Sequence, residues 1–192
     1  MCEQCASPKI DRRAFVLGGL GIAATISLAP FELAAAASDS SRWNLWLERS
    51  DTGEQSYAPF TRDGKTLYFP GYKQLCAVLR DEHVPIYRGW VKIPIRTVEV
   101  LWSVQQYLIR AGVSEPLVVH SGYRTPETNA ATEGAAWNSL HMYGRAVDFH
   151  VRGVDTDELA GICYACPDSG GVGNYAGGWV HIDTGPKRSW TG

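Results

Sequence analysis

The sequence predicts an α+β domain in which a small antiparallel sheet carries a zinc site and helices pack outside it. Two observations predict this fold class. Short runs rich in β-branched and aromatic residues are separated by segments whose apolar residues recur at helical spacing. Histidine and aspartate residues, which are zinc ligands in proteins, lie on or beside several of the short runs.

The first half of the predicted domain is a β-hairpin followed by two helices. Apolar residues alternate through 43–60 on both sides of a turn at Gly53, which is typical of a hairpin. A short helix is predicted for 72–81. The longest helix is predicted for 93–112, where the apolar residues fall on one face and Gly112 closes the segment. We expect that face to be core.

The second half alternates short strands and short helices. A glycine-rich stretch precedes the last strand, and we expect it to be a flexible rim or lid of a cleft. The predicted elements are a strand at 117–120, a helix at about 127–133, a strand at 145–151, a helix at 156–165, the glycine-rich stretch at 169–178 and a strand at 177–183.

Residues 1–37 are predicted to be a twin-arginine signal peptide, which leaves 38–192 as the domain. Arg12–Arg13 precedes an apolar run over 16–30, and Ala34–Ala37 offers small residues to a signal peptidase. The apolar run is shorter than the roughly 20 residues that span a bilayer. We therefore expect cleavage and a periplasmic protein exported in the folded state, with membrane contact only through an uncleaved signal.

The charge balance argues against one class of partner. The formal net charge is −2, and basic residues do not cluster anywhere in the chain. A nucleic-acid-binding protein needs a clustered basic face. We expect no nucleic-acid partner, and the sequence carries no signal for an oligomeric state.

Three cysteines remain after the predicted cleavage: Cys76, Cys163 and Cys166. The last two form a single CxxC, which is a weak zinc signal without a second such pair. In an oxidising compartment a disulfide among the three thiols is the favoured interpretation.

The candidate metal ligands are His141, Asp148 and His181. His141 and Asp148 lie seven positions apart, and Gly144 between them suits a tight turn. This places His141 on a loop and Asp148 on the strand that follows, while His181 lies on a second short strand. A catalytic zinc takes three protein ligands and keeps one position open. His150 shares a strand face with Asp148 and is the competing candidate for a metal ligand. The alternative to a metal site is that His141 and Asp148 form a structural pair without metal.

These motifs resemble those of a known group of enzymes. Ser139-x-His141-x-x-Gly144-x-Ala146-x-Asp148 resembles the signature of the LAS zinc metallopeptidases, the group named for lysostaphin, D-Ala-D-Ala peptidases and sonic hedgehog. Four further segments resemble the branch of this group that contains murein endopeptidase K: Ser121–Pro126, Asn129–Ala130, Gly171–Gly173 and Trp179–Pro186.

The resemblance implies a hedgehog/D-Ala-D-Ala peptidase-like fold and a zinc-dependent murein hydrolase. His141, Asp148 and His181 match the zinc ligands. Arg124 matches an arginine that binds a substrate carboxylate or stabilises the oxyanion. The implied reaction is endopeptidase cleavage of cross-links between peptidoglycan stem peptides by attack of zinc-bound water. The expected bond involves D-Ala and diaminopimelate, although the sequence does not separate 4-3 from 3-3 cross-links.

The general base departs from the pattern of the group. Many LAS enzymes have a Glu three residues before the last ligand or a His two before it, and here these positions are Gly178 and Trp179. Asp183 is the nearest carboxylate, and on a regular strand it shares a face with His181. It is our candidate base. The alternatives are that it orients a ligand or pairs with Arg124.

Two other functions remain open at this point. One is a D-Ala-D-Ala or L,D-carboxypeptidase with the same metal ligands. The other is a non-catalytic module that holds zinc and binds peptidoglycan, which the missing Glu would permit. Both need the same three ligands, so the ligands do not distinguish them.

Overall fold

The structure is a computed structural model that describes residues 43–192. The predicted signal peptide at 1–37 and the domain start at 38 lie outside the described residues. No helix in the described part of the chain is long and apolar enough to cross a membrane.

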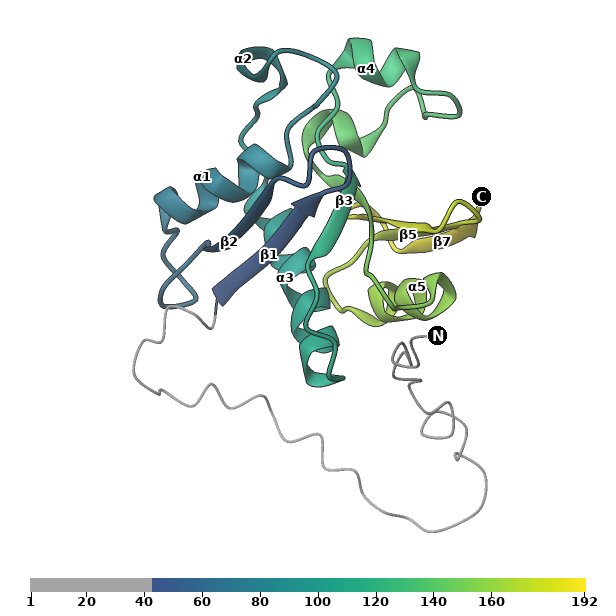
Figure 1. Cartoon of the computed structure of the whole chain (residues 1–192). Coiled ribbons are helices and arrows are strands. Elements are labelled where there is room, and N and C mark those ends of the chain that lie inside the picture. The colour runs from purple at the N-terminus through teal and green to yellow at the C-terminus, as the bar shows by residue number, and fades with distance from the viewer. Residues whose placement is uncertain (1–42) are drawn as a thin grey trace, which may run out of the picture. The chain divides into compact units, whose positions relative to one another are not determined.

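A seven-stranded sheet runs through the domain, in the order β2-β1-β3-β4-β6-β5-β7 (Figure 1). The α+β class is confirmed, but the prediction of a small antiparallel sheet is wrong. The pairs β1/β3 and β5/β7 are parallel, so the sheet is mixed. The strands are β1 (Asn44–Arg49), β2 (Gln55–Pro59), β3 (Leu117–Ser121), β4 (Ala146–His150), β5 (Gly171–Tyr175), β6 (Trp179–Asp183) and β7 (Arg188–Thr191).

Each parallel pair has a simple cause. Three helices lie between β1 and β3 in the chain, and a long crossover returns the chain in the same direction. The β6–β7 connection crosses the start of β5 at Gly170, where a Cβ would overlap the carbonyl oxygen of Gly185. Only a residue without a side chain allows this crossing. Strand β7 was not predicted, because its four residues lack an apolar alternation.

The helices follow the predictions with shifted ends. The helix α5 (Thr156–Ala165) has the predicted bounds, and α3 (Ile95–Arg110) is two residues shorter at each end. The prediction at 72–81 is shifted to α1 (Phe69–Val78). A four-residue α2 (Ile86–Gly89) was not predicted, and α4 (Pro126–Ala131) begins one residue early.

One face of the sheet packs against the hydrophobic core, and the other carries the candidate ligands. Because side chains alternate along a strand, Val147 and Phe149 of β4 and Val180 and Ile182 of β6 point into one core. The helices α1, α3 and α5 pack on that side. The residues between them, including Asp148 and His181, point to the opposite face. The core therefore fixes the strands that carry the candidate ligands.

The glycine-rich stretch borders the cavity over the candidate ligands, as the predicted rim would, but it is a paired strand and not a flexible lid. Its middle is β5, which is paired on both sides, with β6 and with β7. A Cβ at Gly173 would lie 2.6 Å from the Trp190 ring. Glycine is needed here because the Trp190 indole occupies the space that a Cβ would take, and chain flexibility is not the reason.

The predicted disulfide is absent from the described residues. Cys76, Cys163 and Cys166 are all unpaired and buried. Cys76 lies on α1, whereas the other two lie at the end of α5, and all three pack within the hydrophobic core. They act as small apolar residues in this structure.

Candidate metal centre

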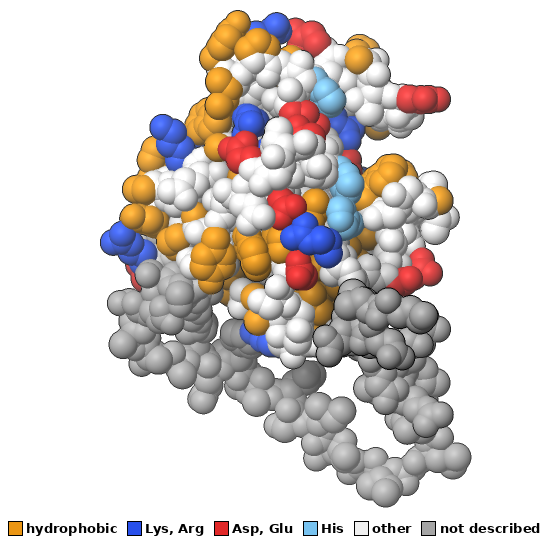
Figure 2. Space-filling view, viewed as in Figure 1, with side chains coloured by type: hydrophobic (Ala, Val, Ile, Leu, Met, Phe, Trp, Pro, Cys, Tyr) orange, Lys and Arg blue, Asp and Glu red, His pale blue; other side chains and the backbone are white. Residues whose placement is uncertain are grey.

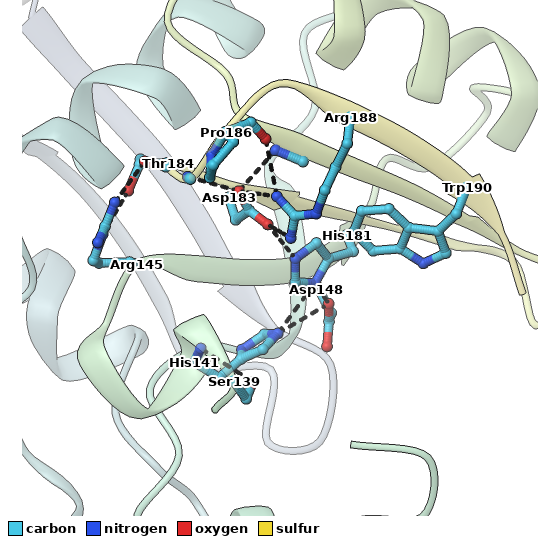
Figure 3. Close-up of polar contacts among 12 residues, drawn as sticks. Ser139, His141, Arg145, Asp148, His181, Asp183, Thr184, Pro186, Arg188 and Trp190 are labelled. Carbon is cyan, nitrogen blue, oxygen red and sulfur yellow. Dashed lines mark hydrogen bonds and ion pairs between the residues drawn. The ribbon is translucent and has the colours of Figure 1, made fainter. Parts of the chain in front are cut away.

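Three donor atoms from separate elements converge on one point. Nε2 of His141 lies 3.2 Å from Nδ1 of His181 and 3.3 Å from Oδ1 of Asp148. Nδ1 of His181 is 2.8 Å from the same carboxylate oxygen. This is the one group of three potential metal-ligating side chains found within the described residues. Figure 3 shows the three side chains pointing toward one another.

His141 is held by its loop and by one backbone carbonyl. It lies in a short 3₁₀ helix (Leu140–Tyr143) where a loop was predicted, and Gly144 ends this helix at φ 63°. The Ser139 hydroxyl caps the helix by accepting from the His141 N–H. Nδ1 of His141 is 2.7 Å from the carbonyl oxygen of Gly122. A carbonyl can only accept, so Nδ1 carries the proton and Nε2 presents a lone pair.

His181 is held in the complementary way. It is paired directly with Asp148 across β4 and β6. Its Nε2 lies 3.2 Å from Oδ2 of Asp183, which leaves Nδ1 facing the other two donors. With the proton on Nε2, where the Asp183 carboxylate accepts a hydrogen bond, Nδ1 presents a lone pair toward the other two side chains.

The arrangement suits a cation. With these tautomers two imidazole lone pairs and one carboxylate oxygen face one another, which is unfavourable unless a positive charge lies between them. Donors around a tetrahedral zinc, each about 2.0–2.1 Å from the ion, are about 3.3 Å apart. The observed separations of 2.8–3.3 Å fit that donor set.

Asp183 lies behind His181 and is fully enclosed, with no exposed side-chain surface. Its Oδ1 accepts from the backbone N–H groups of Gly171 and Gly185, at 2.7 and 2.8 Å. Arg188 donates to Oδ2 at 2.6 Å. Burial tends to raise the pKa of Asp183, but the hydrogen bonds from His181, Arg188 and the two N–H groups outweigh it and lower this pKa. The shared face predicted for Asp183 and His181 is therefore observed.

Arg124 lies on the other side of the candidate ligands. Its Nη2 donates to Oδ2 of Asp148 at 2.6 Å, and its Nε donates to the Ser121 hydroxyl at 2.7 Å. The arginine partner of Asp183 is Arg188, so the pairing of Asp183 with Arg124 that we had considered is not present. Among the described residues, Nη1 of Arg124 has no hydrogen-bond acceptor.

The turn that carries Gly122 and Arg124 is anchored on the end of α1. The Tyr123 N–H donates to the Leu79 carbonyl. Gly122 approaches that carbonyl so closely that a Cβ would overlap it. The buried Asp81 carboxylate accepts from the Thr125 N–H at 2.7 Å. This anchor sets the position of the carbonyl that orients His141.

His120 and His150 lie outside the three-residue group. Nε2 of His120 is 2.7 Å from Nδ1 of His150, and the His120 ring contacts Trp179. His150 therefore has a histidine partner of its own. Burial lowers the pKa of both histidines.

A cavity of about 430 Å³ opens over the candidate ligands. The loop after α4 forms one wall and strands β5, β6 and β7 form the other. In Figure 2, histidine side chains gather on the surface between the part of the molecule that carries α4 and the part that carries β5 and β7. Three residues of the second wall were not predicted from the sequence: Tyr175, Arg188 and Trp190. The only signal was the Arg-x-Trp spacing, which places both side chains on one face of a strand.

Comparison with known proteins identifies the family. The family model described as "Peptidoglycan L,D-endopeptidase MepK" matches residues 36–190. The chain belongs to this family. It is 32% identical to peptidoglycan L,D-endopeptidase MepK of Escherichia coli K12 over 186 residues, which cover 93% of this chain and 96% of the relative. It is 30% identical to the probable peptidoglycan L,D-endopeptidase MepK of Haemophilus influenzae over 178 residues, covering 90% and 91%.

Asp81 should link stability to pH through the turn that it anchors. Burial tends to raise its pKa, but hydrogen bonds from Thr128, Thr125 and His83 outweigh burial and lower it. A lowered folded-state pKa stabilises the protein above the unfolded value of about 3.9, and this contribution is lost as the pH falls further. Asp81→Asn should therefore reduce the free energy of unfolding at pH 7 by about 1–3 kcal/mol.

Denaturant unfolding at pH 7 and pH 3 measures this difference. The gap between wild type and Asp81→Asn should narrow at pH 3. Asp168→Asn is the control, because Asp168 is a half-exposed partner of Arg96 and should change stability by less than about 0.5 kcal/mol. An equal gap at both pH values would contradict the anchoring role of the carboxylate.

Proposed function

We propose that this chain is a zinc-dependent peptidoglycan endopeptidase that hydrolyses cross-links between stem peptides. Membership of the family supports the peptidase activity and the peptidoglycan substrate. The observation that carries the proposal is the convergence of two imidazoles and one carboxylate at the floor of an open cavity, since this donor set suits a cation and the cavity gives a substrate access to it.

We assign the metal to His141, Asp148 and His181. Two imidazoles and one carboxylate suit zinc, and three protein ligands leave a position open. When bound, zinc supplies a Lewis acid that polarises a carbonyl and lowers the pKa of water toward about 7. In the reaction the oxygen of water bonds to the carbonyl carbon, the peptide C–N bond breaks, and the released amine takes a proton.

We assign two supporting roles to the surrounding chain. Arg124 offers Nη1 to the developing oxyanion or to a substrate carboxylate, while its other donors keep Asp148 in place. Asp183 orients His181 and fixes its tautomer. The full enclosure of Asp183 favours this role over that of a general base, because a base needs hydrogen-bond reach to the proton that it takes.

We propose an L,D bond as the target. The relatives carry "L,D-endopeptidase" in their names. In a 4-3 cross-link the acyl residue is D-Ala, which is a D-centre, so an L,D bond corresponds to a 3-3 cross-link between two diaminopimelate residues. This proposal replaces the D-Ala cross-link expected from the sequence.

A peptidoglycan substrate places the protein outside the cytoplasm. We propose the periplasm as its location, with 1–37 as a cleaved twin-arginine signal and 38–192 as the mature enzyme. The Arg12–Arg13 pair and the small residues at Ala34–Ala37 support this assignment.

Digestion of purified sacculi tests the proposed activity. The zinc-loaded protein should reduce the amount of 3-3 cross-linked dimers, as resolved by mass spectrometry. A chelator should abolish this loss, and His181→Ala should reduce it to background, because both remove the metal. His83→Ala is the control, since His83 is an exposed histidine outside the site.

Two other outcomes would indicate a different function for this protein. Release of a single terminal residue with dimers intact would indicate a carboxypeptidase. Protein that carries one zinc per chain, binds sacculi and releases no product would indicate a non-catalytic binding module and would overturn the proposal.

Asp183→Asn separates the orienting role from the base role. If Asp183 orients His181, the variant should bind zinc about 10–100-fold more weakly, and most of the lost turnover should return when zinc is saturating. Zinc affinity by competition with a chromophoric chelator and kcat at saturating zinc measure the two effects. Wild-type zinc affinity with a kcat reduced by about 10³-fold would instead indicate the base.

A further inference from the structure

Arg188 is the second guanidinium that lines the cavity, on the side opposite Arg124. It begins β7 and lies next to Asp183 and His181 (Figure 3). Arg124 is largely buried, with 14% of its side chain exposed, whereas Arg188 is 46% exposed. The half-exposed guanidinium beside the candidate metal centre is therefore Arg188.

The Arg188 side chain is held in one position before any ligand arrives. Nη1 donates to the Pro186 carbonyl at 3.0 Å and to Oδ1 of Asp183 at 3.3 Å, and Nη2 donates to Oδ2 of Asp183 at 2.6 Å. The guanidinium also lies 5.1 Å from the centre of the Trp190 ring. Trp190 is itself fixed by a hydrogen bond to the Tyr175 hydroxyl. A positioned guanidinium loses little side-chain entropy when it binds a ligand.

Arg188 still has binding capacity. Within the described residues no hydrogen bond is made by its Nε, and its only carboxylate partner is Asp183. That carboxylate also accepts from His181 and two backbone N–H groups. By comparison, Arg49 and Arg152 each form ion pairs with two carboxylates, whereas Arg188 has one. A guanidinium with spare donors in a cavity suits a carboxylate ligand.

The proposed substrate has such a carboxylate. Diaminopimelate carries a carboxylate on each of its two amine-bearing carbons. A cross-link made through its second amine therefore leaves a free carboxylate on the carbon next to the scissile nitrogen. We propose that Arg188 binds this carboxylate and makes it a requirement for efficient cleavage. The inference rests on the proposed function and names the substrate group that the β7 side of the cavity recognises.

Paired substrates test the role of Arg188. One is a 3-3 cross-linked muropeptide dimer with the free carboxylate, and the other is the same dimer with that carboxylate converted to a carboxamide. The zinc-loaded full chain should cleave the carboxylate form with a kcat/KM about 10–100-fold higher, as expected for one charge-assisted hydrogen bond. Arg188→Gln should remove this preference, chiefly through KM, while zinc content stays at one per chain.

Two further variants make the result specific. Arg188→Lys keeps the charge and should retain part of the preference. Arg152→Gln is the matched control, because Arg152 is also 46% exposed but pairs with Glu48 and Glu115 away from the cavity. This variant should keep the full preference. If Arg188→Gln does not fold or loses zinc, the inference is tested by two other results. These are the preference of the wild type for the carboxylate dimer and the part of that preference that Arg188→Lys retains.

The contradicting outcomes are distinct. Equal cleavage of both dimers by the wild type would overturn the inference and leave the proposed function intact. An equal loss on both dimers in Arg188→Gln would show that Arg188 acts only by positioning Asp183. No cleavage of either dimer by zinc-loaded wild type would overturn the proposed function itself.

Discussion

Three lone pairs directed at one point are the constraint on which the rest of this site depends. The Gly122 carbonyl and the Asp183 carboxylate each accept a hydrogen bond from the outer nitrogen of an imidazole. The inner nitrogens of His141 and His181 therefore point toward Asp148. Such a group is unfavourable without a cation. The fold must therefore hold its parts rigidly, and each outer partner is itself anchored: Gly122 on α1, and Asp183 by backbone N–H groups of β5 and the turn after β6.

The sheet supplies that rigidity through its alternation. The same strands that place Val147, Phe149, Val180 and Ile182 in the core place the polar residues on the opposite face. A shift of either strand by one residue would bury the ligands and expose the core, so core packing also sets the register of the site. The direct pairing of Asp148 with His181 follows from that register.

Local patterns predicted much of this arrangement. The His141–Asp148 spacing, the helical face of α3 and the period-two relation of His181 to Asp183 are short-range features, and the structure contains each. The errors involve contacts between distant segments. The sequence predicted a flexible segment at the glycines near 171–173. In the structure, the Trp190 ring occupies the space that a side chain at Gly173 would take. Likewise, Asp183 pairs with Arg188 and not with Arg124 because β7 lies beside β5, and β7 is a strand too short and too polar to predict.

The most direct test of the account is zinc K-edge X-ray absorption on the full chain carrying one equivalent of zinc. The account predicts a first shell of nitrogen and oxygen only, with two imidazoles, and loss of one imidazole in His181→Ala. A sulfur ligand would place the metal at the cysteines instead. That result, or a shell without imidazole, would contradict the assignment of His141, Asp148 and His181.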